Sequence, residues 1–193
     1  MKLDKLFAGL KQIANGDYVL EGDLISEEDL VINLDDRLVV KGKIVVKKSI
    51  KAGCGIKAGE GIEAGEGIEA GCGIEAGCGI KAGWGIKAGC GIEAGCGIKA
   101  GWGIKAGEGI EAGCGIEAGE GIEAKTFIHS ERRIFAGISV YHTSANCNKT
   151  IKCAELRNGE ICFGDLVIEE PIIKMTIAEI EQKLGIKNLK IKE

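Results

Sequence analysis

Isoleucine recurs every six residues through the middle of the chain, and this period dominates the pattern of hydrophobic and polar positions. Residues 51–123 repeat Ala-Gly-x-Gly-Ile followed by Lys or Glu without interruption. The isoleucines of this array are Ile56, Ile62, Ile68, Ile74, Ile80, Ile86, Ile92, Ile98, Ile104, Ile110, Ile116 and Ile122. Positions 32, 38, 44 and 50 before the array, and 128, 134 and 140 after it, carry Ile, Leu or Val in the same phase. A short period held over this length predicts a solenoid.

Three hexads are expected to form one coil, because a single hexad is too short to enclose a core. Residues 75–92 and 93–110 differ only where Cys90 stands against Glu108. The variable residue x also sorts into columns when every third hexad is compared: Cys54, Cys72, Cys90 and Glu108; Glu60, Cys78, Cys96 and Cys114; Glu66, Trp84, Trp102 and Glu120. Recent gene duplication without structural meaning is the alternative explanation. We predict an all-β fold, a parallel β-helix with triangular coils of about 18 residues.

The order of residues within the hexad predicts which side chains point inward. Ile and the Ala two residues later share one side of an extended segment, and the intervening Lys or Glu lies on the other. Burial of each isoleucine contributes roughly 1.5–3 kcal/mol, whereas each glycine costs roughly 0.5–1 kcal/mol relative to Ala. We therefore expect many glycines to sit at corners with positive φ. The residue x should point outward there, because inward glutamates would be buried charges without partners.

Both ends of the chain carry helical patterns. Apolar residues of the first segment recur at steps of three and four: Leu3, Leu6, Phe7, Leu10, Ile13 and Ala14. This spacing predicts an amphipathic helix that caps the solenoid. Near the other end, Asn158-Gly159 predicts a tight turn between two strands, and Thr176 to Glu179 has the spacing of a capping box. The predicted organisation is an N-terminal helical cap (1–16), a solenoid (17–170) and a C-terminal helix–strand cap (171–193).

Composition narrows the possible functions. The formal net charge of −4 disfavours general nucleic-acid binding. No apolar run is long enough to span a membrane, and the first residues lack the features of a secretory signal. Nine cysteines, an odd number, predict reduced thiols rather than a disulfide framework. We expect a cytoplasmic protein without a cofactor.

Cysteine columns are the sharpest candidates for chemistry. Adjacent strands lie about 4.8 Å apart, so two outward ladders of thiols are expected: Cys54, Cys72 and Cys90, and Cys78, Cys96 and Cys114. Thiolates suit soft metals, but a line of thiols is not the tetrahedral set of structural zinc. The plain alternative is that cysteine is a small residue tolerated at a corner.

A second group of potential ligands follows the array: His142, Cys147, Cys153 and Cys162. Its spacings are not the short paired spacings of zinc fingers. Ordinary packing explains these residues better, and we expect no metal there.

Trp84 and Trp102 are predicted to stack on one exposed corner. Lysines flank this corner at Lys81, Lys87, Lys99 and Lys105, and glutamates line the remaining side at Glu75, Glu93 and Glu111. Like charges stacked in a column repel one another. One interpretation is that these charges only keep a repetitive sheet soluble. The other is a lateral interface, in which a basic aromatic corner meets an acidic side.

The segment Leu38 to Val46, which reads Leu-Val-Val-Lys-Gly-Lys-Ile-Val-Val and runs into Ile50-Lys51-Ala52-Gly53, resembles the coils of bactofilins. These are polymer-forming bacterial cytoskeletal proteins. The glycine array is also similar to uncharacterised bacterial and phage proteins built of Ala-Gly-x-Gly-Ile hexads. The resemblance covers roughly residues 30–140. It implies triangular β-helical coils with short tails and assembly end to end without nucleotide.

Enzyme classes fit the sequence less well. Hexapeptide acyltransferases share triangular coils, but their hexad has a small residue where this chain has Cys, Glu or Trp, and both His129 and His142 lie beyond the array. The Gly-x-Gly unit lacks the Lys-Ser/Thr of a phosphate loop. We expect a non-enzymatic scaffold protein that self-associates as a homo-oligomer. A binding module that presents Cys and Trp corners to a protein partner or soft metal is the alternative, and an acyltransferase is a remote one.

Overall fold

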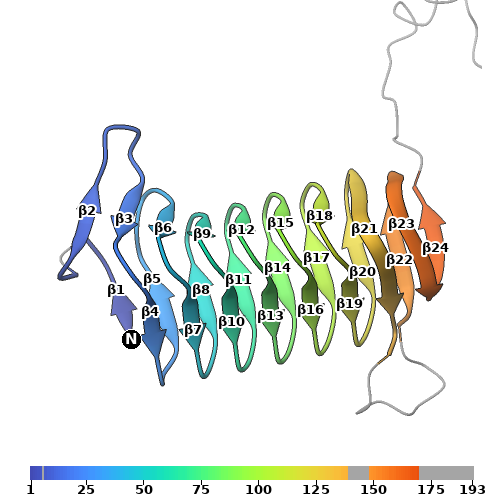
Figure 1. The fold of residues 1–193 in the computed structure, drawn as a ribbon, viewed down its shortest axis with the longest axis horizontal. Coiled ribbons are helices and arrows are strands. Elements are labelled where there is room, and N and C mark those ends of the chain that lie inside the picture. Colours follow the sequence, from blue (N-terminus) through green and yellow to red (C-terminus); the bar gives the residue numbers. More distant parts are fainter. Residues whose placement is uncertain (6, 139–147, 170–193) are drawn as a thin grey trace, which may run out of the picture.

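The computed structural model describes residues 1–5, 7–138 and 148–169, and it is a parallel β-solenoid (Figure 1). Each regular coil contributes three short strands, one to each of three faces. Strands in successive coils pair in parallel with partners three hexads apart, as Ile62 with Ile80 and Ile80 with Ile98. The prediction of three hexads per coil is confirmed. The predicted C-terminal cap, 171–193, lies outside the described residues.

The three faces are named here by their strands. Face A contains β3 (Tyr18–Leu20), β6 (Leu38–Val40), β9 (Ile56–Ala58), β12 (Ile74–Ala76), β15 (Ile92–Ala94) and β18 (Ile110–Ala112). Face B contains β4 (Leu24–Ser26), β7 (Ile44–Val46), β10 (Ile62–Ala64), β13 (Ile80–Ala82), β16 (Ile98–Ala100) and β19 (Ile116–Ala118). Face C contains β1 (Lys2–Leu3), β5 (Leu30–Ile32), β8 (Ile50–Ala52), β11 (Ile68–Ala70), β14 (Ile86–Ala88), β17 (Ile104–Ala106), β20 (Ile122–Ala124), β22 (Thr150–Cys153) and β24 (Asp165–Ile168).

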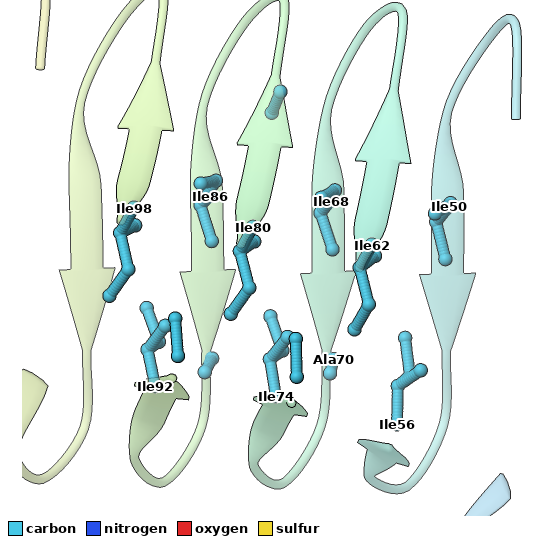
Figure 2. Packing of buried hydrophobic residues seen from close by; sticks show 14 of the residues in the cluster. Ile50, Ile56, Ile62, Ile68, Ala70, Ile74, Ile80, Ile86, Ile92 and Ile98 are labelled. Carbon is cyan, nitrogen blue, oxygen red and sulfur yellow. The ribbon is translucent and has the colours of Figure 1, made fainter. Parts of the chain in front are cut away.

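Within the regular array the core is built from isoleucine and alanine, and leucine and valine join it in the first coils. Array isoleucines are at most 2% exposed, and the alanines two residues later are also buried. Figure 2 shows the isoleucines of successive coils stacked in rows inside the solenoid. The Lys or Glu between them lies on the outside, as the alternation predicts. Repetition of one hexad therefore produces one continuous apolar interior.

The array glycines correct one expectation. None of them has positive φ; among the described residues, the glycines that do are Gly9, Gly16, Gly22, Gly137, Gly159 and Gly164. The first glycine of a hexad is instead packed against the backbone of the preceding coil. A Cβ on Gly89 would lie 2.0 Å from the carbonyl oxygen of Gly71. Close approach between coils, rather than a left-handed backbone, requires glycine there.

The first coil is longer than the others. Tyr18 pairs with Leu38 and Leu30 pairs with Ile50, so the separation of these partners exceeds three hexads by two positions. The extra residues form a longer corner in which Leu34 is buried. Ile32 is consequently the third residue of β5 rather than the first, and the six-residue phase begins at Leu38.

The predicted N-terminal helix over 1–16 is wrong. The described residues of this segment contain β1 and β2 (Leu10–Gln12), and β2 pairs antiparallel with β3. Strand β1 adds to β5 on face C, where Leu3 is fully buried. Directly after the segment, Asp17 forms an ion pair of 2.8 Å with Arg37, and this guanidinium lowers the pKa of the Asp17 carboxyl. The first coil of the solenoid has strand edges with unpaired backbone groups. Hydrogen bonding of β1 and β2 to these edges is more favourable than the helix that the spacing of apolar residues predicts.

The last coils are irregular. Strand β21 (Phe127–Ala136) is long enough to pair with β18 on face A and then with β19 on face B. Strand β23 (Glu155–Phe163) lies parallel to β21. Asn158-Gly159 lies within β23, beside a shift in register, so the predicted tight turn there is wrong. Among the described residues, no helix has the length and apolarity needed to cross a membrane.

Candidate interaction surface

Trp84 and Trp102 occupy equivalent corners of successive coils, between face B and face C. Their rings stack with centroids 5.5 Å apart and an angle of 9° between planes. The backbone N–H of Trp102 donates to the carbonyl of Trp84 at 3.1 Å, so the coil spacing sets the stacking distance. The two side chains remain 46% and 45% exposed. The pair is thus a rigid apolar ridge that projects from the solenoid.

The four lysines beside this ridge are already paired within the chain. On face B, Lys81 contacts Glu63 at 3.0 Å and Lys99 contacts Glu117 at 2.7 Å. On face C, Lys87 contacts Glu69 at 2.9 Å and Lys105 contacts Glu123 at 2.8 Å. Each column therefore reads Glu-Lys-Lys-Glu, and each lysine turns away from its like neighbour. The expected repulsion between stacked lysines is relieved by these outer glutamates, which sequence reasoning missed.

Face A carries the acidic column. Glu75 is paired with Lys57 and lies 3.7 Å from the Arg37 guanidinium. Glu93 and Glu111 follow in direct register, and neither makes an ion pair with any described residue. These side chains line a groove of about 910 Å³ along the face. Further acidic residues at its walls are Asp17, Asp35, Asp36 and Glu108, and Arg37 lies among them.

The Trp ridge and the acidic groove lie on opposite sides of each coil. The ridge is the corner where β13 meets β14 and where β16 meets β17, and face A is the remaining face. One copy of the chain can therefore present its ridge to a second copy while its own groove stays open. All the predicted surface residues therefore lie on the exterior of neighbouring coils. The tryptophans and lysines lie at and beside the corner between faces B and C, and the three glutamates lie on the opposite face, face A.

The predicted cysteine ladders are present at the other two corners. The N–H groups of Cys96 and Cys114 donate to the carbonyls of Cys78 and Cys96 respectively, each at 3.0 Å. In the second ladder the N–H of Cys90 donates to Cys72 at 3.2 Å. All six thiols are free and at least partly exposed. Burial and then neighbouring charges, including adjacent thiols, raise the pKa of Cys90 and Cys96.

The remaining described cysteines do not join a ladder. Cys153 is buried in β22, and this burial raises the pKa of its thiol, whereas Cys162 is exposed on β23. His142 and Cys147, the other members of the group considered after the array, lie outside the described residues. His129 lies on β21, with its Nε2 2.8 Å from Glu131 Oε1. Within the described part of the chain, no three or more metal-ligating side chains converge on one point.

Comparison with protein-family models, with curated proteins and with solved structures finds no match to this chain. The part of the resemblance to bactofilins that the structure bears out is the solenoid itself, stacked coils of repeated short strands.

Proposed function

We propose that the protein is a non-enzymatic structural protein that self-associates through its solenoid surface. The observation that carries this proposal is the stacked, half-exposed pair of Trp84 and Trp102. Tryptophan is enriched among the residues that dominate binding energy at protein interfaces. A preformed stack loses little side-chain freedom on binding, which favours association.

The partner we propose is a second copy of the chain, which receives the ridge in the groove of face A. Charge supports this choice, because Glu93 and Glu111 in the groove have no ion-pair partners among the described residues, and a lysine beside the ridge can exchange its intrachain glutamate for one of them. A contact between two different surfaces is heterologous, so it adds copy after copy and forms either a ring or an open filament. This lateral assembly suits a scaffold, and the acidic net charge disfavours nucleic acid as an alternative partner.

A cytoplasmic location is part of the same proposal. Exposed neighbouring thiols that remain unpaired suit a reducing compartment. A relationship to bactofilins would fit a structural role, although the assembly proposed here is lateral rather than end to end.

Sedimentation velocity over a hundredfold concentration range, in reductant, tests self-association, and electron microscopy of the densest sample shows its form. The wild type should form larger species with rising concentration. Trp84→Ser/Trp102→Ser removes the ridge, and Glu93→Lys/Glu111→Lys reverses the groove; both should weaken association by roughly tenfold or more. Glu21→Lys, a charge reversal at the N-terminal end, should change little. A monomeric wild type, or association that survives both double substitutions, would remove the basis of the proposal.

A further inference from the structure

The two cysteine ladders place thiols at the spacing that a two-coordinate soft metal requires. Adjacent parallel strands are separated by about 4.8 Å. A bond between a thiolate and a first-row metal is roughly 2.3 Å long, so two such bonds in line span roughly 4.6 Å. The spacing of the coils therefore matches the sulfur–sulfur separation that one bridging metal ion requires.

We propose that the ladders Cys78/Cys96/Cys114 and Cys54/Cys72/Cys90 are binding sites for Cu(I), held between adjacent coils by pairs of thiolates. As the metal binds, each participating thiol releases its proton to solvent and one sulfur–copper bond forms in its place. Copper enters and remains as Cu(I), so no electron is transferred. Neither ladder lies at the corner of the Trp ridge, but Cys54 and Cys72 line the groove of face A, so only the ladder Cys78/Cys96/Cys114 lies apart from the residues that line this groove.

The geometry selects the metal. Structural zinc needs four ligands around one point, and no group of three or more ligands converges in the described residues. Cu(I) prefers soft thiolates and accepts two of them in line. The ladder Cys78/Cys96/Cys114 is the more regular of the two. Its two backbone hydrogen bonds between consecutive cysteines are both 3.0 Å long, whereas those of the other ladder are 3.5 Å and 3.2 Å.

The middle cysteine of each ladder decides the test. Without Cys96, the thiols of Cys78 and Cys114 are two coil spacings apart, roughly 9.6 Å, which a single ion cannot bridge. Without an end cysteine, one adjacent pair remains. The variants Cys72→Ser/Cys96→Ser and Cys54→Ser/Cys78→Ser therefore lose the same number of thiols but differ in whether any adjacent pair survives. Both keep Cys153 and Cys162 as a common background.

Anaerobic titration with Cu(I), in competition with a chromophoric chelator and with ascorbate present, measures affinity and stoichiometry. The wild type and the end variant should each hold about one tight Cu(I) per ladder. The middle variant should bind roughly a hundredfold more weakly, because the second thiolate of a pair adds an intramolecular bond. Circular dichroism confirms that both variants remain folded. Equal copper binding by the two variants, or no binding by the wild type against the chelator, would overturn the proposal.

Discussion

Two glycines of the same corner have different tasks at the residue scale. The Cβ of an alanine at Gly89 would lie 2.0 Å from the Gly71 carbonyl oxygen, a distance that backbone atoms cannot tolerate. The Cβ at Gly91 would lie 3.4 Å from the Gly109 carbonyl oxygen, which is close to ordinary contact. Neither glycine has positive φ. At this corner, therefore, only the first glycine, Gly89, is required by the stacking of coils.

Substitution of these two glycines separates the steric explanation from a conformational one. Gly89→Ala should lower the free energy of unfolding by roughly 1–3 kcal/mol, because the coils must shift apart locally. Gly91→Ala should be neutral or raise stability by about 0.4–1 kcal/mol, because alanine reduces the freedom of the unfolded chain. Chemical denaturation followed by circular dichroism measures both. If the two variants were equally destabilised, close approach between coils could not be the reason for glycine.

Sequence reasoning found the glycine-rich corner but gave the wrong cause for it. The composition shows only that glycine is present, and positive φ is its commonest use. The contact between Gly89 and Gly71 depends on the separation of coils in three dimensions, which no local pattern contains. The outward position of Trp84 was predictable, by contrast, because its size can be compared directly with a narrow interior.

At the scale of the strands, charge is arranged along columns of equivalent positions. Lys81 and Lys99 each have a glutamate on the side away from the other lysine, whereas Glu93 stands between Glu75 and Glu111 in direct register. Like charges directly opposite on neighbouring strands reduce stability. The column of glutamates on face A therefore lowers the stability of the fold. A surface that costs stability in this way fits a role in binding.

Glu93→Lys should stabilise the folded chain, because it places a cation between two carboxylates. The expected gain in the free energy of unfolding is about 0.2–1 kcal/mol in low salt, and it should shrink in molar salt, which screens exposed charges. Glu93→Gln is the matched control and should give a smaller gain, since it only removes repulsion. Chemical denaturation at two salt concentrations measures the effect. A loss of stability, or a gain independent of salt, would contradict this account of the column.

At the scale of the whole molecule, the sequence predicted the middle better than the ends. The hexads specify inward Ile, the coil length and the columns, because each repeat meets the same environment. At the N-terminal end, the spacing of Leu3, Phe7 and Leu10 is helical, yet β1 and β2 form there. The unpaired edges of the first coil decide that outcome, and they exist only once the solenoid is formed. The greater length of the first coil escaped prediction because Ile32 happens to continue the period.

The equivalence of coils makes deletion of one complete coil a test of the architecture. Removal of residues 75–92 joins Ile74 to Glu93 and restores the same local sequence. Lys99 then lies between Glu63 and Glu117, so the ion-pair columns persist. Because each repeat contacts only its neighbours, the shortened chain should fold cooperatively with a slightly lower thermal midpoint. Its length in small-angle X-ray scattering should fall by about 4.8 Å.

A shorter deletion should do more damage. Removal of residues 75–86 keeps the hexad but rotates everything after it by one face, since it removes two hexads and not three. Lys57 would then align with Lys87 and Lys105, and Glu63 with Glu93 and Glu111, so that two of the three columns become runs of one charge. The thermal midpoint should fall below that of the whole-coil deletion and recover partly in salt. If the deletion of 75–92, the longer one, instead had the lower thermal midpoint, stability would depend on the number of hexads alone. The columns formed by every third hexad would then make no contribution to stability.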